Sequence, residues 1–128
     1  MALLHDLTGQ AQENNDFRRV VATGEHTQVV VMSIPVDGEI GEEVHEVEDQ
    51  LLYLVSGEGE VKLGSDTHTF EAGDAVLVPA GENHNVINTG GEELKIITTY
   101  SPPHHDDGTV HATKAEADAA EAEEHEEV

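Results

Sequence analysis

Short β-branched segments, separated by turn residues, dominate the chain from Phe17 to Tyr100. Glycine- or proline-containing turns such as 35–38, 57–59 and 79–81 lie between the segments. The segments are 18–22, 27–34, 49–56, 60–63, 67–70, 75–78, 85–88 and 94–100. Many short strands with turn residues at this spacing are typical of an all-β sandwich or barrel. The pattern therefore predicts an all-β domain.

The rest of the chain differs in character from this central region. A length of 128 residues suits one domain, and we expect four segments: an N-terminal arm at 1–16, a β-domain at 17–100, a Pro- and His-rich strap at 101–112, and an acidic Ala/Glu tail at 113–128. The tail is rich in good helix formers. Glutamates at its C-terminal end oppose the helix dipole, so we expect it to be disordered or a short helix.

The acidic excess extends over the whole chain. There are 28 Asp and Glu against 5 Lys and Arg, which gives a net charge of −23. Segment 113–128 contains only seven of these acids, so an acidic tail does not explain the excess. A hydrophobic content of 37% argues against general disorder. We favour adaptation to a salt-rich cytoplasm, because molar salt shortens the Debye length to about 3 Å and screens the self-repulsion.

Composition also excludes several partners and sites. Five cations are too few to neutralise the phosphates of a nucleic acid or to dock on an anionic membrane. There is no cysteine, so disulfides and thiolate ligands are excluded. The apolar run Ala2-Leu3-Leu4 is interrupted at once by His5, and no signal peptide is recognisable. We therefore expect a cytoplasmic protein.

Two histidines, His45 and His84, lie at positions where a strand or a turn is expected to direct the side chain into the domain. Glu43 and His45 are two residues apart, so on a strand both side chains point to the same face. His84 follows a tight turn, Pro79-Ala80-Gly81, that begins a new strand. Gln50 has the opposite parity to His45 and shares its face only if a turn or bulge intervenes. Segment 46–49 is the candidate for this turn or bulge.

Two segments resemble the sequence motifs of the cupin superfamily. Segment 38–57 resembles the first motif, with His45, Gln50 and Gly57 at matching spacing. The second motif, G-x5-P-x-G-x2-H-x3-N, is matched at every fixed position by Gly73, Pro79, Gly81, His84 and Asn88. The resemblance covers about residues 20–100. It implies a double-stranded β-helix, or jelly-roll barrel, that is usually dimeric and holds one metal.

The resemblance implies four metal-ligand positions, namely Glu43, His45, Gln50 and His84. The family pattern has His at the first position and Glu at the third, so this chain departs from it twice. Two imidazoles and one carboxylate suit a divalent transition metal such as Fe, Mn, Zn or Ni. The alternative is a barrel that has lost its metal and uses His45 and His84 as hydrogen-bonded pocket residues. We favour a bound metal.

Further residues are candidates for catalysis or substrate binding. If Glu43 is not a ligand, it is a candidate general base. Tyr53, Asn88, Tyr100 and His111 are candidate substrate contacts. Each also has a simpler interpretation: Tyr53 has outward parity, Asn88 suits a turn, and the strap that carries His111 either folds over a barrel opening or lies on the surface.

These observations favour a small metal-binding cupin that acts as an oxygenase or isomerase on a small organic molecule. A phosphorylated substrate is disfavoured because phosphate is usually held by Arg or Lys, and this chain has few of them. The alternatives are a non-catalytic cupin that binds or senses a small molecule, and a structural or storage barrel. Segments 27–34 and 51–55 are apolar on both faces, which predicts a homodimer.

The spread of acidic charge generates a first testable prediction. We expect the fold to be lost cooperatively as KCl is lowered from molar to millimolar concentration, because the screening of self-repulsion is lost. Circular dichroism during dialysis measures this loss. Folding that persists unchanged in millimolar salt would contradict the adaptation to high salt but not the all-β fold.

Overall fold

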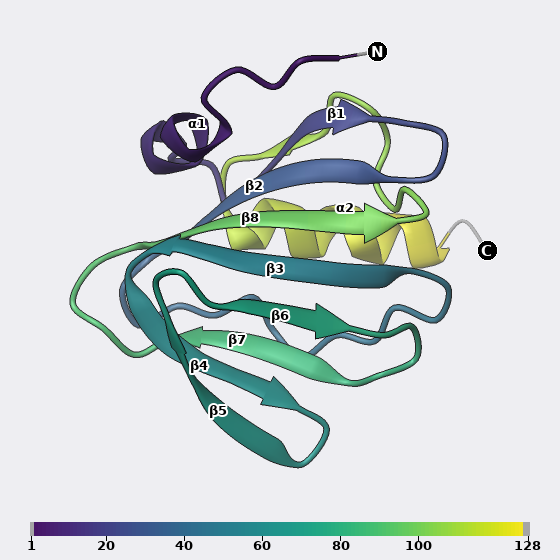
Figure 1. Cartoon of the computed structure of the whole chain (residues 1–128). Helices are drawn as coiled ribbons and strands as arrows, with labels where there is room; N and C mark the ends of the chain where they lie inside the picture. The colour runs from purple at the N-terminus through teal and green to yellow at the C-terminus, as the bar shows by residue number, and fades with distance from the viewer. Residues whose placement is uncertain (1, 127–128) are drawn as a thin grey trace.

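The computed structural model describes residues 2–126, with side chains described up to Glu121. A short helix precedes the strands and a longer one follows them (Figure 1). In chain order the elements are α1 (Leu7–Glu13), β1 (Arg18–Thr23), β2 (Gln28–Ile34), β3 (Asp49–Ser56), β4 (Glu58–Leu63), β5 (Asp66–Glu71), β6 (Ala75–Val78), β7 (His84–Asn88), β8 (Leu94–Ser101), β9 (Val110–His111) and α2 (Lys114–Glu126).

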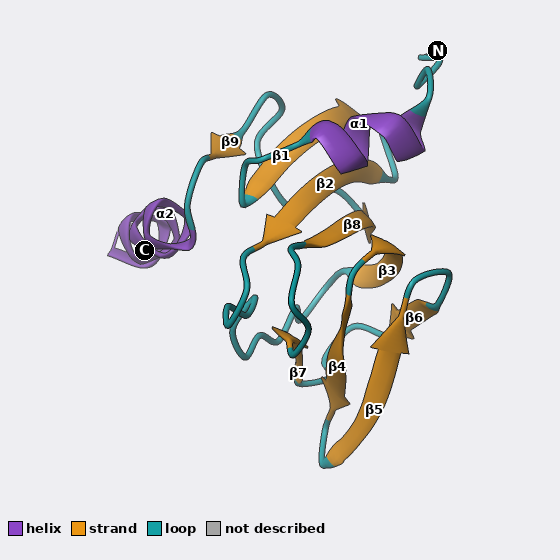
Figure 2. Cartoon of the chain, turned by 90° about the vertical axis from the view of Figure 1, so that its left-hand side faces the viewer, coloured by secondary structure: helices purple, strands orange, loops and turns teal. Residues whose placement is uncertain are grey.

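The strands form two antiparallel sheets. The larger sheet has the order β6-β3-β8-β2-β1-β9, and the smaller has the order β5-β4-β7. Figure 2 shows β4, β5 and β7 lying below the strands of the larger sheet. The predicted all-β, double-stranded β-helix is confirmed, and each of the eight predicted strands overlaps one of β1–β8.

Alternation along the strands fills the space between the sheets. On β3, Gln50, Leu52 and Leu54 are buried, whereas Leu51 and Tyr53 are exposed. Leu52 and Leu54 join one apolar cluster that also includes Phe70, Ile96, Val30, Met32, Val61 and Val86. Burying each of these side chains contributes about 1.5–3 kcal/mol to folding, and this core fixes the strand register.

The inward face changes from apolar to polar towards one end of the barrel. At the apolar end, Ile34 pairs with Leu94. At the other end, Gln28 and Gln50 both pair with Tyr100 from opposite sides of β8. All three polar side chains are buried. This register therefore places a row of hydrogen-bonding groups at one end of the barrel.

The two ends of the chain are held by specific polar contacts. The Nζ atom of Lys95, on β8, donates to the backbone oxygen of Asn14 at 2.6 Å and so fastens the segment after α1. At the start of α2, the backbone N–H of Glu116 donates to Thr113 Oγ1, and Glu116 Oε2 accepts from the backbone of Ala112. This arrangement is a variant of the capping box, in which the Glu116 carboxylate reaches the residue before the N-cap Thr113.

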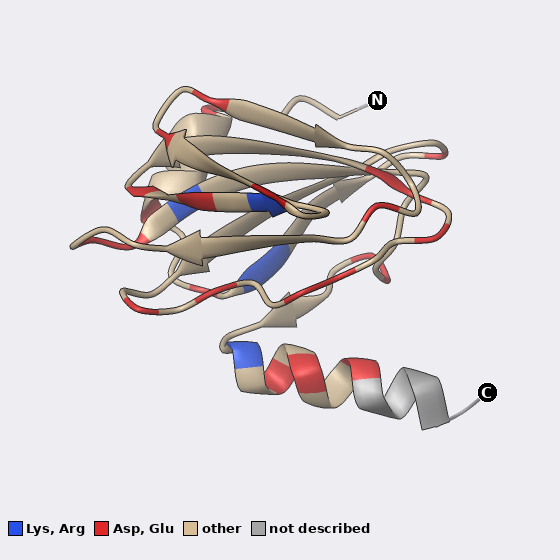
Figure 3. Cartoon of the chain, turned by 90° about the horizontal axis from the view of Figure 1, so that it is seen from below, with Lys and Arg blue, Asp and Glu red and all other residues tan. Residues whose placement is uncertain are grey.

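Segment 113–128 was expected to be disordered or a short helix. These capping contacts and the burial of Ala117 explain why it forms a helix. Residues 127–128 of the predicted tail lie outside the described residues. Acidic side chains are distributed over the strands, the loops and α2 (Figure 3). Among the described residues, no helix is both long and apolar enough to cross a membrane.

Candidate metal centre

Glu43, His45 and His84 converge at the polar end of the barrel. Glu43 Oε2 lies 2.8 Å from His45 Nε2. One donor atom from each of the three residues lies within 4.8 Å of the other two. His45 and His84 are buried, and the side chain of Glu43 is 15% exposed. Two imidazoles and a carboxylate in this arrangement are a suitable donor set for a divalent transition metal.

Backbone pairing holds these ligand residues in place. The N–H of Glu43 donates to the oxygen of His84, and the N–H of His84 donates to the oxygen of Glu43, both at 2.9 Å. The N–H of Gly81 donates to the oxygen of His45 at 2.8 Å. Gly81 has a φ of +87°, which strongly favours glycine. The turn that precedes β7 therefore fixes the segment that carries His45.

The hydrogen bonds of His84 orient its ring. Nδ1 lies 3.0 Å from the backbone oxygen of Glu82, which only accepts, so Nδ1 carries a proton. With the proton on Nδ1, Nε2 presents a lone pair to the interior, 3.0 Å from Gln50 Oε1, which also only accepts. Two such atoms at this distance favour a cation between them rather than a hydrogen bond. A backbone carbonyl that fixes the tautomer of a histidine in this way is usual for metal ligands.

The surroundings of His45 fit a cation better than a hydrogen bond. Its buried Nε2 makes no well-directed hydrogen bond, although Glu43 Oε2 lies only 2.8 Å away. A buried polar atom without a partner is costly and calls for an explanation. A metal ion bound between this nitrogen and Glu43 satisfies both atoms, so the residues present fit the implied metal.

Glu43 is held in its charged form. Burial alone would raise the pKa of its carboxyl group, but its contact with the adjacent His45 and the nearby Arg18 guanidinium and His84 ring lower it overall. Arg18 Nη2 lies 3.8 Å from Glu43 Oε1. A carboxylate that remains ionised is ready to bind a cation.

A second group of possible ligands adjoins the first through His45. His45, Glu48 and His104 also have donor atoms within 4.8 Å of one another, and His104 Nδ1 lies 3.1 Å from Glu48 Oε2. Gln28 positions the loop that carries His104, because its Oε1 accepts from the backbone N–H groups of His104 and His105. The two groups form one continuous cluster.

The four sequence-predicted ligand positions meet, but the candidate substrate contacts do not all join them. Tyr100 is buried with its ring 5.5 Å from that of His45. Tyr53 is 37% exposed, on the face of β3 opposite to Gln50. Asn88 Nδ2 donates to the backbone oxygens of Ile34, Pro35 and Glu92, which is a turn contact.

The strap lies against the barrel. His111, on β9, pairs with Arg18 on β1, and its Nδ1 is buried without a partner. Sequence reasoning did not select Arg18, Gln28, Glu48 or His104 as site residues. Adjacent residues on a strand point to opposite faces, so only one of Arg18 and Arg19 can enter the barrel, and Arg18 is the one that is buried. The pair of adjacent histidines in the strap is the sequence feature from which His104 could have been identified as a site residue.

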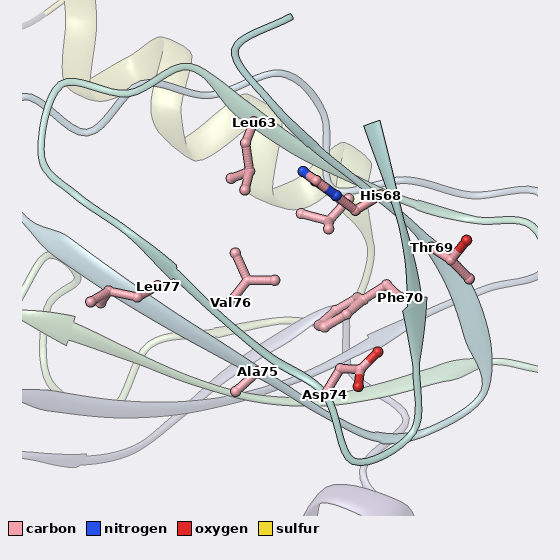
Figure 4. A pocket seen from close by; sticks show the side chains of 9 residues that line it. Leu63, His68, Thr69, Phe70, Asp74, Ala75, Val76 and Leu77 are labelled. Atoms are coloured by element: carbon pink, nitrogen blue, oxygen red, sulfur yellow. The ribbon is translucent and has the colours of Figure 1, made fainter. Parts of the chain in front are cut away.

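A separate hollow lies between β4, β5 and β6, away from the His/Glu cluster. Its volume is about 380 Å³, and Figure 4 shows Leu63, Val76 and Phe70 among the side chains that line it. His68 and Asp74 are its titratable residues. Neither belongs to a group of possible metal ligands among the described residues, so the hollow does not compete as a metal site.

The family model for the cupin domain matches residues 30–100, which is more than half of the chain. The chain belongs to the cupin family. This cupin is 47% identical to the uncharacterized protein YrkC of Bacillus subtilis over 116 residues, which are 86% of the chain and 62% of YrkC. It is 30% identical to an oxalate-binding protein of Thermotoga maritima over 66 residues, 52% of the chain and 54% of that protein. The cupin thus spans less than two thirds of these relatives.

Solved structures show the same fold. BH2720 of Bacillus halodurans superposes with a TM-score of 0.91 at 40% identity, covering 93% of this cupin and 95% of that chain. KdgF of Halomonas sp. superposes with a TM-score of 0.64 at 26% identity, covering 68% of this cupin and 80% of that chain.

Removing one imidazole from the cluster tests the metal centre. We expect His84→Ala to weaken binding of Co²⁺ or Zn²⁺ by at least about 100-fold, because changes that only touch a ligand's partner already cost about 10- to 100-fold. Metal content after dialysis in molar KCl, measured by mass spectrometry, reports the loss. His68→Ala, at an exposed histidine of β5, is the matched control. Equal retention in His84→Ala and wild type would place the metal elsewhere.

Proposed function

We propose that this cupin binds one divalent transition metal through Glu43, His45 and His84 and acts on a small non-phosphorylated organic molecule. The observation that carries the proposal is the buried, unpartnered His45 Nε2 beside the Glu43 carboxylate. Gln50 supports the centre through its contact with His84 Nε2. A bound metal supplies Lewis-acid chemistry or a site for O₂, and Fe, Mn, Zn and Ni all suit these donors.

Buried polar side chains surround the candidate metal centre. Tyr100 is almost fully buried, and burial raises the pKa of its hydroxyl well above the ordinary 10. The hydroxyl therefore stays protonated and remains able to donate a hydrogen bond to a bound molecule. Gln28 holds the strap residues His104 and His105 over the same end of the barrel. We infer that this loop limits the size of the molecule that enters.

Oxygenase or isomerase chemistry is our leading proposal, in a protein that works in a salt-rich cytoplasm. A non-catalytic role in binding or sensing a small molecule is the second candidate. It is favoured by the relative named an oxalate-binding protein. The superposition, at 25% identity and a TM-score of 0.58, on a predicted oxalate decarboxylase from the same organism favours a catalytic role instead.

Turnover by metal-loaded protein separates these two candidates. Protein loaded with Fe²⁺, Mn²⁺, Zn²⁺ or Ni²⁺ is incubated with a panel of small organic acids, hydroxy acids and enols, and O₂ uptake and product formation are followed by electrode and NMR. We expect turnover with at least one metal, and its loss in His84→Ala but not in His68→Ala. Saturable binding without turnover would support the sensing role, and the absence of both would overturn the proposal.

We also propose that this cupin forms a homodimer through the outer face of β3 and β6. On that face Leu51 pairs with Leu77, and Tyr53 lies two residues further along β3. These side chains are 39%, 66% and 37% exposed, respectively. An apolar patch on a sheet is a common site of association. The patch continues the apolar pattern that predicted a dimer from the sequence.

A charge introduced into this patch tests the dimer. We expect wild type to sediment as a dimer and Leu77→Glu as a monomer in sedimentation velocity at molar KCl. The dimer interface would bury the introduced carboxylate against the same patch of the second copy. Leu3→Glu, at a residue that is 82% exposed, is the control and is expected to remain dimeric. A monomeric wild type would contradict the proposal.

A further inference from the structure

Arg18 is a buried cation whose hydrogen-bonding capacity is mostly unused. Its side chain lies on the inward face of β1 and the residue is 1% exposed. Nε and Nη1 are buried without any partner, and the nearest carboxylate oxygen to Nη2 is Glu43 Oε1 at 3.8 Å. A buried guanidinium with two empty donor positions is costly unless a ligand completes it.

The groups around Arg18 do not compensate its charge fully. His111 faces it across the β1–β9 pair, and the ring of Phe17 lies 5.3 Å from its guanidinium carbon. Burial lowers the pKa of the neighbouring His105 to about 2, so this ring is neutral. On α2, burial and the charge of Glu43 raise the pKa of Glu121, which makes it a weaker counter-ion.

Glu43 is shared between Arg18 and the candidate metal centre. One of its oxygens faces Arg18 and the other faces His45 Nε2. A divalent cation at the centre would leave this region with a net positive charge, because the metal and the guanidinium carry three positive charges and the carboxylates of Glu43 and Glu48 supply two negative ones. An anionic group is therefore favoured next to Arg18.

We propose that Arg18 anchors a carboxylate group of the substrate beside the metal centre, so that the substrate is a small carboxylic acid. The guanidinium presents donors in a planar fork that matches the two oxygens of a carboxylate. Tyr100 borders the same space and supplies a hydroxyl. The inference rests on the proposed function only in calling the bound acid a substrate; the anion site stands on Arg18 itself.

A carboxylate suits this site better than a phosphate. Arg18 is the buried arginine of the chain, and the other arginine, Arg19, is exposed on the opposite face of β1. The remaining cations near the barrel are engaged elsewhere: Lys95 donates to Asn14 and Ser33 on the outer side of the sheet. One guanidinium balances a single carboxylate group, which carries one charge even in a dicarboxylate, whereas a phosphate dianion carries two charges on one group and needs more than one cation.

Because the chain contains only two arginines, NMR of the unaltered protein tests the site directly. Side-chain Nε–H signals of ¹⁵N-labelled, Zn²⁺-loaded protein are recorded at fixed KCl during titration with oxalate, acetate, the neutral amide oxamide and inorganic phosphate. We expect the carboxylates to shift the Arg18 signal saturably, with Arg19 as the internal reference. Oxamide and phosphate are expected to leave the Arg18 signal in place.

Substitutions of the two arginines then test which side chain contributes to the free energy of oxalate binding. We expect Arg18→Lys to weaken oxalate binding, measured by calorimetry, by about tenfold or more, because lysine cannot donate from a planar fork. Arg19→Lys is the matched control and is expected to bind as wild type does. Thermal unfolding of both variants confirms that each is folded before binding is compared, and the titration of wild type needs no variant at all.

Three outcomes would overturn the inference: carboxylates that bind without moving the Arg18 signal, phosphate that moves it when carboxylates do not, or no anion that moves it. If the proposed metal centre is wrong, the protein takes up no Zn²⁺, and this is measured separately. The same titration of metal-free protein then still decides whether Arg18 binds a carboxylate.

Discussion

The reciprocal backbone hydrogen bonds between Glu43 and His84 are the contact on which the candidate site depends. They join two parts of the chain about forty residues apart at the polar end of the barrel. The register of β3, β8 and β2 then adds Gln50, Tyr100 and Gln28 to the same end. The strands build the apolar core. The backbone pairing of Glu43 with His84 brings the candidate metal ligands together at one end of that core.

Electrostatics separates the site from the remaining surface. Most acidic side chains of this strongly acidic chain lie on strands, loops and α2 that face solvent (Figure 3). Glu43 differs because it is largely buried between an arginine and two histidines. The excess of surface acid does not make the interior negative. The interior pairs one carboxylate with a guanidinium and imidazoles, and this balance favours a bound cation with an anion beside it.

The strands and the inward histidines were predictable because their signals are local. β-Branched segments separated by turn residues identified the strands, and the turn at Pro79-Ala80-Gly81 predicted that His84 points inward. Arg18 was not predictable as a site residue, because alternation leaves two neighbouring arginines equivalent until pairing with β2 and β9 is known. The place of His104 depends on the distant Gln28, and the helical state of α2 depends on Ala117 packing against the core.

The central claim is that two imidazoles and the Glu43 carboxylate hold one metal ion. A chain with 28 acids can retain divalent ions at its surface, so metal content alone does not identify the ligands. X-ray absorption spectroscopy at the cobalt edge of Co²⁺-loaded protein does, because imidazole rings give characteristic outer-shell scattering. The account predicts scattering from two imidazoles with the remaining ligands oxygen. A shell of oxygen atoms without imidazole scattering would contradict it.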